Sequence, residues 1–143
     1  MNIFRRIAHW LHLVAATLVV LGVVVQVYLA AGQLFGADSL DAHTEVGWAV
    51  HTLEVLVFLA ALAAWLPRAD IVLSFLLALV GTLQITPFAN QSEWVGAIHG
   101  GGALVVFALA ALVAHRSARA LTRARRGPAP AAPAGTGTPP PPA

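Results

Sequence analysis

Four long runs of apolar residues, separated by short polar segments, make up most of this 143-residue chain. They predict helices at about 7–31, 46–66, 70–87 and 94–114. A helix needs about 20 residues to cross a hydrocarbon core of about 30 Å, and each run is close to that length. The pattern therefore predicts an all-α, integral membrane four-helix bundle rather than a soluble domain with one buried core.

Composition agrees with a membrane protein and excludes several kinds of chemistry. Hydrophobic residues make up 59% of the chain and charged residues 10%, whereas soluble domains carry about a quarter charged residues. Cysteine is absent, so disulfides, iron–sulfur clusters and thiolate nucleophiles are excluded. Hydrolase and phosphate-binding motifs are also missing. The sequence leaves enzymatic activity undecided and favours a protein that is not an enzyme by itself.

The charged residues predict the orientation of the bundle. If the N-terminus is cytoplasmic, all eight arginines fall on the cytoplasmic side, and the acidic residues Asp38, Asp41, Glu45 and Glu93 fall outside. We therefore predict that both termini are cytoplasmic. The basic run after the fourth span then reads as a topology anchor against anionic lipid, which replaces a nucleic-acid interpretation of the high pI.

The C-terminal part of the chain differs from the rest. Residues 1–116 are predicted as the transmembrane domain and 117–143 as a tail, basic at first and then disordered. From Gly127 onward the tail holds only Gly, Pro, Ala and Thr, which cannot bury enough apolar surface to offset the entropy of ordering. The use of arginine without lysine, together with abundant alanine, favours a bacterial protein of the plasma membrane.

A layer of polar residues lies inside the predicted spans, where ionisable groups are costly and need a reason. His51 lies six residues below the outer start of the second span, and His99 lies six residues below the start of the fourth. Both are therefore about 9 Å deep, at one level. The other members of the layer are Gln26, Glu54 and Gln84.

Two imidazoles at one depth on separate helices are what a b-type haem with two histidine ligands needs. Glycines at 96, 100, 101 and 102 would let a flat macrocycle approach the backbone. We therefore predict one haem b between His51 and His99, with His43 at the mouth of the second span as the alternative to His51. The same residues also fit a polar layer without cofactor, in which Gly96 and Gly100 serve helix packing, or a proton or metal site.

Three further histidines, His9, His12 and His115, lie near the cytoplasmic ends of the spans. A second haem there would favour His115 on the same face of the fourth helix as His99. Sixteen residues separate the two, a rotation of about 160°, so they point to opposite faces. Snorkelling of these side chains to the headgroup region is the simpler prediction.

Short motifs in chain order resemble a known family. They are Val23–Ala30, Ala42–Trp48 with His51, Gln84, and Ala97–His99. Together they resemble a four-helix bacterial membrane family, domain of unknown function 6220, which implies the architecture and carries no established activity.

A weaker resemblance is to four-helix, b561-type bacterial cytochromes b. Arg5 to Leu11 is similar to their first-helix Arg…His-Trp-Leu, and His43 followed by Gly47 is similar to their second-helix His…Gly. That resemblance implies haem ligation by His9 and His43.

Three functions follow as hypotheses. The first is a small cytochrome that passes electrons to a membrane redox partner. The second is a non-catalytic accessory or structural subunit without cofactor, in a larger complex or a homo-oligomer. The third is a proton or metal transporter, which four short unbroken spans disfavour because they leave little room for alternating access.

Overall fold

The computed structural model describes residues 2–36, 40–85 and 93–126. These residues form four α-helices and no strand: α1 (Ile3–Leu34), α2 (Leu40–Ala63), α3 (Arg68–Ile85) and α4 (Glu93–Arg126). Each helix is long and apolar enough to cross a membrane. The prediction of an all-α protein is confirmed, and its four helices are long and apolar enough to span a membrane.

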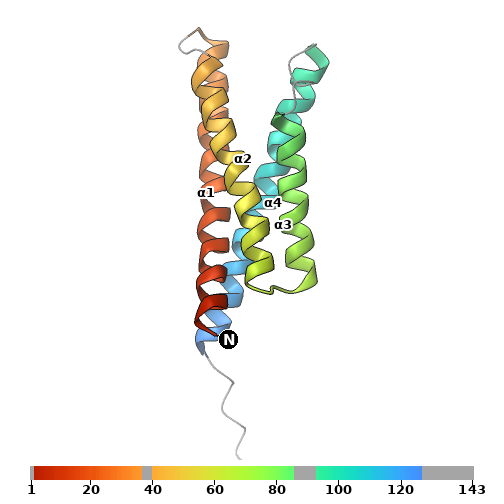
Figure 1. Cartoon of the computed structure of the whole chain (residues 1–143). Helices are drawn as coiled ribbons and strands as arrows, with labels where there is room; N and C mark the ends of the chain where they lie inside the picture. The colour runs from red at the N-terminus through yellow and green to blue at the C-terminus, as the bar shows by residue number, and fades with distance from the viewer. Residues whose placement is uncertain (1, 37–39, 86–92, 127–143) are drawn as a thin grey trace, which may run out of the picture.

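The helices form two antiparallel hairpins, α1–α2 and α3–α4 (Figure 1). Each helix packs against two neighbours, in the cyclic order α1, α2, α3, α4, so that α2 and α4 lie diagonally opposite. In Figure 1 the hairpins lie together near the N-terminus and diverge toward the other end. We call these the inner and outer ends, after the predicted orientation.

Small side chains fill the centre of the bundle. The most completely buried core residues are Ala16, Val19, Val57, Ala61, Leu77 and Ala110. Leucine, phenylalanine and tryptophan side chains are instead prominent on the outside, as at Leu34, Trp65 and Trp94. An apolar exterior suits lipid, which is as apolar as these side chains, and small interior residues let the helices approach closely.

The inner turn between α2 and α3 is held by the start of α1. Trp65 adopts a positive φ of 53°, and α3 begins after Pro67. The Arg5 guanidinium donates hydrogen bonds to the carbonyl oxygens of Ala64 (3.2 Å) and Trp65 (3.3 Å). Carbonyls at a helix C-terminus lack helical partners and carry partial negative charge, so a cation there satisfies and stabilises them.

The last helix is longer than predicted. Residues 117–126, expected as the start of a tail, continue α4 without interruption to Arg126. Ser117 and Leu121 are buried on one face of this extension, and the Arg125 guanidinium lies 5.1 Å from the centre of the Trp10 ring. Residue 116 therefore lies within a continuous helix. The disorder predicted from Gly127 onward lies outside the described residues.

Opposite charges mark the two ends of the bundle. The arginines lie at the start of α1, at the start of α3 and in the last turns of α4, all of which reach the inner end. Arg116 forms an ion pair with Asp70 there. Asp41 and Glu45 lie in the first turns of α2, at the outer end. This is the predicted distribution of charge. The compartment that each end faces stays a prediction.

Candidate functional site

The central feature of the outer half is a pair of histidines from diagonal helices. His43 lies in the first turn of α2 and His99 in the second turn of α4. Their ring centroids are 6.1 Å apart, with an angle of 61° between the ring planes. The Nδ1 atom of each ring is buried and has no hydrogen-bond partner among the described residues. The site thus brings together two imidazoles whose polar atoms are incompletely satisfied, which is costly inside a membrane.

A glutamine from the preceding helix contacts each of these histidines. Gln26 Nε2 donates to the His43 carbonyl oxygen at 3.0 Å, and Gln84 Nε2 donates to the His99 carbonyl oxygen at 2.7 Å. The polar layer predicted from the sequence therefore includes two side chains that reach neighbouring helices.

His51, predicted as the partner of His99, is directed elsewhere. Its Nδ1 lies 3.0 Å from the Oε2 atom of Glu54, and its ring lies edge-on to Trp48, with 6.5 Å between centroids. The ring contact of His99 is with His43, the alternative named from the sequence. The physical reason is that α2 begins at Leu40 rather than near residue 46. This start puts His43 inside the helix and His51 further from the outer end.

Glu54 is the most deeply buried acidic side chain described, with 2% of its surface exposed. Its carboxyl group extends from α2 to α3 and lies where a Cβ at Gly81 would otherwise sit. Ser74, Ala78 and Gly81 form a strip of small, buried residues along α3. At Gly81 this strip therefore leaves room for the carboxyl group of Glu54, in addition to letting the helices pack closely.

The backbone around His99 is partly uncovered. Among the described residues, a Cβ added at Gly96, Gly100 or Gly101 would meet no atom of another helix within 4 Å. Gly96 and Gly100 are rotated from His99 by about 60° and 100° in one direction, and Gly102 by about 60° in the other. Since Gly102 contacts Gln84 of α3, Gly96 and Gly100 lie on the side toward α1. Open space therefore adjoins His99 on that side.

A second polar cluster lies in the inner half and joins three helices. His12 of α1 is 1% exposed, and its Nδ1 and Nε2 atoms lie 3.1 Å from Ser117 Oγ of α4 and 3.0 Å from Ser74 Oγ of α3. The Ser74 hydroxyl donates its proton to the Asp70 carbonyl oxygen. Ser74 must therefore accept from Nε2–H, while Nδ1 accepts from Ser117. The expectation that His12 snorkels to the headgroups is wrong, because its ring is fully enclosed.

The structure brings neither of the other inner histidines opposite His12 from another helix. Both nitrogens of His12 are engaged by serines, and His115 lies on an exposed face of α4. His9 is 7% exposed and has a buried Nε2 atom without a partner in the described part of the chain. Its ring centroid is 6.3 Å from that of His12, one turn away on the same helix.

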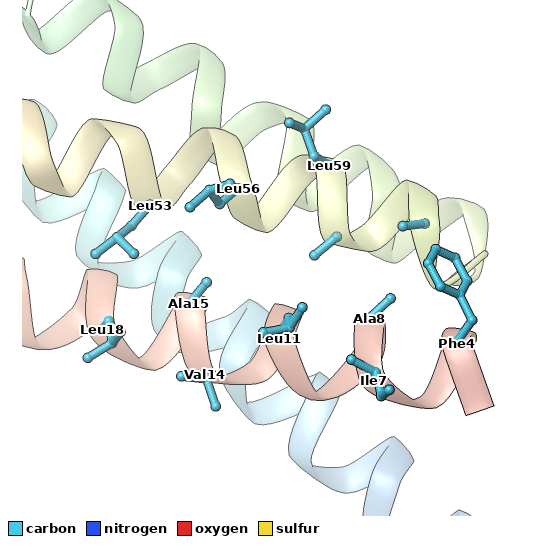
Figure 2. Close-up of a pocket in the computed structure, with 12 residues that line it drawn as sticks. Phe4, Ile7, Ala8, Leu11, Val14, Ala15, Leu18, Leu53, Leu56 and Leu59 are labelled. Carbon is cyan, nitrogen blue, oxygen red and sulfur yellow. The ribbon is translucent and has the colours of Figure 1, made fainter.

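An apolar groove of about 420 Å³ runs between α1 and α2 in the inner half. Figure 2 shows Ile7, Leu11, Leu53 and Leu56 among the side chains that line it. Every lining residue is aliphatic or phenylalanine, so the groove offers no group that could orient a polar substrate. Its apolar lining fits a hydrocarbon chain, and the groove is separate from the polar layers.

Sequence reasoning found the members of the outer layer but missed the partners of several of them. Gly47, Gly81 and Gly102 each make room for a polar side chain from a neighbouring helix. The signal in the sequence was a glycine within one turn of a histidine, at His43 with Gly47 and at His99 with Gly102. Among the described residues, no group of three or more His, Cys, Asp or Glu side chains could hold a metal ion.

The fold and site define a multi-pass helical membrane protein with one polar layer in its outer half and another in its inner half. Comparisons with protein-family models, curated proteins and solved structures gave no match for this chain.

Proposed function

We propose that the protein binds one b-type haem between His43 and His99 and carries single electrons near the outer face of the membrane. The distance between the two rings carries the proposal. Metal–imidazole bonds are about 2 Å long and the nitrogen lies about 1 Å from the ring centre, so one ion between two imidazoles separates the centroids by about 6 Å. The separation of His43 and His99 is 6.1 Å.

Two further observations support a flat ligand at this position. The surface of α4 at Gly96 and Gly100, next to His99, is exposed, and no described residue lies within 4 Å of a Cβ added there. Both imidazoles also have a buried, unpartnered Nδ1. A buried polar atom without a partner is costly, and a bound metal ion is one group that would satisfy it.

The two histidines would determine the kind of chemistry. His43 and His99 would hold the haem iron through both imidazoles, and the group would then supply one-electron transfer rather than reaction with a small-molecule substrate. The residues of this chain would hold the iron from two helices, keep water away through the apolar bundle, and leave the site close to the outer end. A membrane redox partner would then exchange electrons at that end.

The sequence-based assignment of His51 as the ligand opposite His99 stays the main alternative. Its Nδ1 atom is engaged by Glu54, although its Nε2 atom is not. His43 is also the residue that the resemblance to b561-type cytochromes implicates. A comparison of the three histidines therefore tests both the function and its ligands.

The test is a reduced-minus-oxidised absorption spectrum of the detergent-purified protein, expressed with haem in excess, beside His43→Ala, His99→Ala and His51→Ala. We expect a b-type spectrum that is lost in the first two variants and retained in the third. Loss in His51→Ala with retention in His43→Ala would transfer the ligand role to His51. A colourless wild-type protein would overturn the cytochrome proposal.

A second function is favoured by one observation. Gly96 and Gly100 form an exposed small-xxx-small pair on α4 that no described residue of another helix covers, and such pairs let a further transmembrane helix approach closely. In that case the protein is an accessory subunit without cofactor, in a homo-oligomer or a larger complex. It would purify colourless, and Gly100→Leu would release the partner helix without disturbing the bundle.

The proposal also includes the membrane in which the protein lies and its orientation there. We place the protein in a bacterial plasma membrane, with both termini in the cytoplasm and lipid around the bundle. The arginine-rich inner end supports this orientation.

A further inference from the structure

The two hairpins repeat one local arrangement around His43 and His99. In each, a glutamine near the outer end of the first helix donates to the carbonyl oxygen of a histidine on the second helix. The glutamine precedes its histidine by 17 residues in one hairpin and by 15 in the other. A glycine follows each histidine within about one turn. The corresponding pairs are Gln26 with Gln84, His43 with His99, and Gly47 with Gly102.

The glycines are what allow the glutamines to reach. A Cβ at Gly47 would lie 2.7 Å from Gln26 Nε2, and a Cβ at Gly102 would lie 2.5 Å from Gln84 Oε1. Real Cβ atoms do not approach other atoms this closely, so only glycine leaves room for the carboxamide on the neighbouring helix. The arrangement therefore depends on a glutamine and a glycine in each hairpin, and both hairpins contain this pair.

The two glutamine hydrogen bonds restrict the orientation of the His43 and His99 imidazole rings. A carbonyl inside a helix already accepts one bond from its own helix, and the glutamine uses its second lone pair. Because the bond connects the backbone of the histidine to the neighbouring helix, it restricts rotation of α2 about its axis at His43, and of α4 at His99. Both hydrogen bonds are partly buried, which limits the competition from water for these groups.

We infer that Gln26 and Gln84 are the positioning residues of the haem site, and that each sets the orientation of one axial imidazole. The inference rests on the proposed function, because it assigns a role toward the bound haem. It extends that function to two residues on helices that carry no ligand.

The experiment compares Gln26→Met, Gln84→Met and the double variant with the wild-type protein, all loaded with haem. Methionine keeps the length of glutamine and removes the donor. Gln33→Met is the matched control, because it makes the same change on α1 two turns beyond Gln26. The readouts are the haem dissociation constant, the midpoint potential and the low-spin electron paramagnetic resonance spectrum, which responds to the relative orientation of the two imidazole planes.

We expect each single variant to weaken haem binding about five- to tenfold, the effect of one lost hydrogen bond. Each should also shift the resonance spectrum and the midpoint potential, and the double variant should change both further. Gln33→Met should match the wild type. A loss of fold alone would lower the haem content without changing the spectrum of the haem that remains.

The two proposals fail in different ways. Haem-free wild-type protein would overturn the proposed function and this inference together. Haem-loaded wild type with unchanged affinity, spectrum and potential in all glutamine variants would overturn the positioning role and leave the cytochrome proposal intact.

Discussion

The carboxyl group of Glu54 occupies the space that a side chain at residue 81 would need. Gly81 lies on α3 and Glu54 on α2, and the Glu54 oxygens lie around the position that a Cβ on Gly81 would take. His51 then lies 3.0 Å from one of these oxygens. Because Gly81 of α3 has no side chain, the bundle has room for the buried carboxyl group of Glu54 from α2.

Gly81→Ala should lower the free energy of unfolding by about 1–3 kcal/mol, because the new methyl group displaces a buried carboxyl group. The measurement is denaturant unfolding in detergent micelles. Gly101→Ala is the matched control, since a Cβ there meets open space. It should be neutral or stabilising by up to about 1 kcal/mol through helix propensity. Combining Gly81→Ala with Glu54→Ala should remove most of the penalty of the first change, and additive effects would contradict the contact.

Loss of the two serines beside His12 should weaken the inner half of the bundle. Ser74→Ala and Ser117→Ala each remove one partner of a fully enclosed ring, at an expected cost of about 1–3 kcal/mol for the polar atom left unsatisfied. Thermal unfolding in micelles would measure this cost. Thr17→Val serves as control, because the Thr17 hydroxyl bonds only to its own helix at Leu13. Serine variants as stable as the control would show that the ring does not join the three helices.

Arg5→Gln should destabilise the inner turn, because Arg5 donates to the carbonyls that end α2. Charge-assisted hydrogen bonds contribute about 1.5–3 kcal/mol when buried, and partial exposure should reduce the loss here to about 1 kcal/mol. Limited proteolysis at the α2–α3 turn would report it. Arg6→Gln changes the neighbouring, exposed arginine by the same chemistry and should leave the cleavage rate unaltered.

The orientation can be tested with single cysteines, because the chain contains none of its own. Phe35→Cys, at the exposed outer end of α1, should react in intact cells with a maleimide that does not cross membranes. Arg119→Cys, in the inner part of α4, should react only after the cells are opened. The reverse pattern would place the arginine-rich end outside and contradict the positive-inside assignment.

Hydropathy was sufficient to predict the number and order of the helices, because a membrane span has few alternatives. The helix ends were harder to predict. Asp41 lies before the predicted start of the second span, yet acidic residues favour the first turns of a helix through its dipole, and α2 begins at Leu40. Because α2 begins six residues before the predicted start at 46, His43 lies inside the helix and takes the position beside His99 that the sequence assigned to His51.

Contacts between distant helices could not be read from the sequence. His12 meets serines 62 and 105 positions away, and these contacts depend on the rotation of three helices about their axes. The extension of α4 left a clue in Ser117 and Leu121, four residues apart among arginines and both buried. Basic residues after a span usually indicate its end, so the arginines made the continuation of α4 hard to predict.

The repeated glutamine and histidine pairs mean that each hairpin carries half of a site. A nascent chain that has inserted only α1 and α2 exposes one imidazole and cannot clamp a ligand from two sides. The second imidazole arrives with α4, after the last hairpin has entered the bilayer and packed beside the first. If haem binds at the outer site as proposed, its retention would therefore require that both hairpins have entered the membrane and packed together.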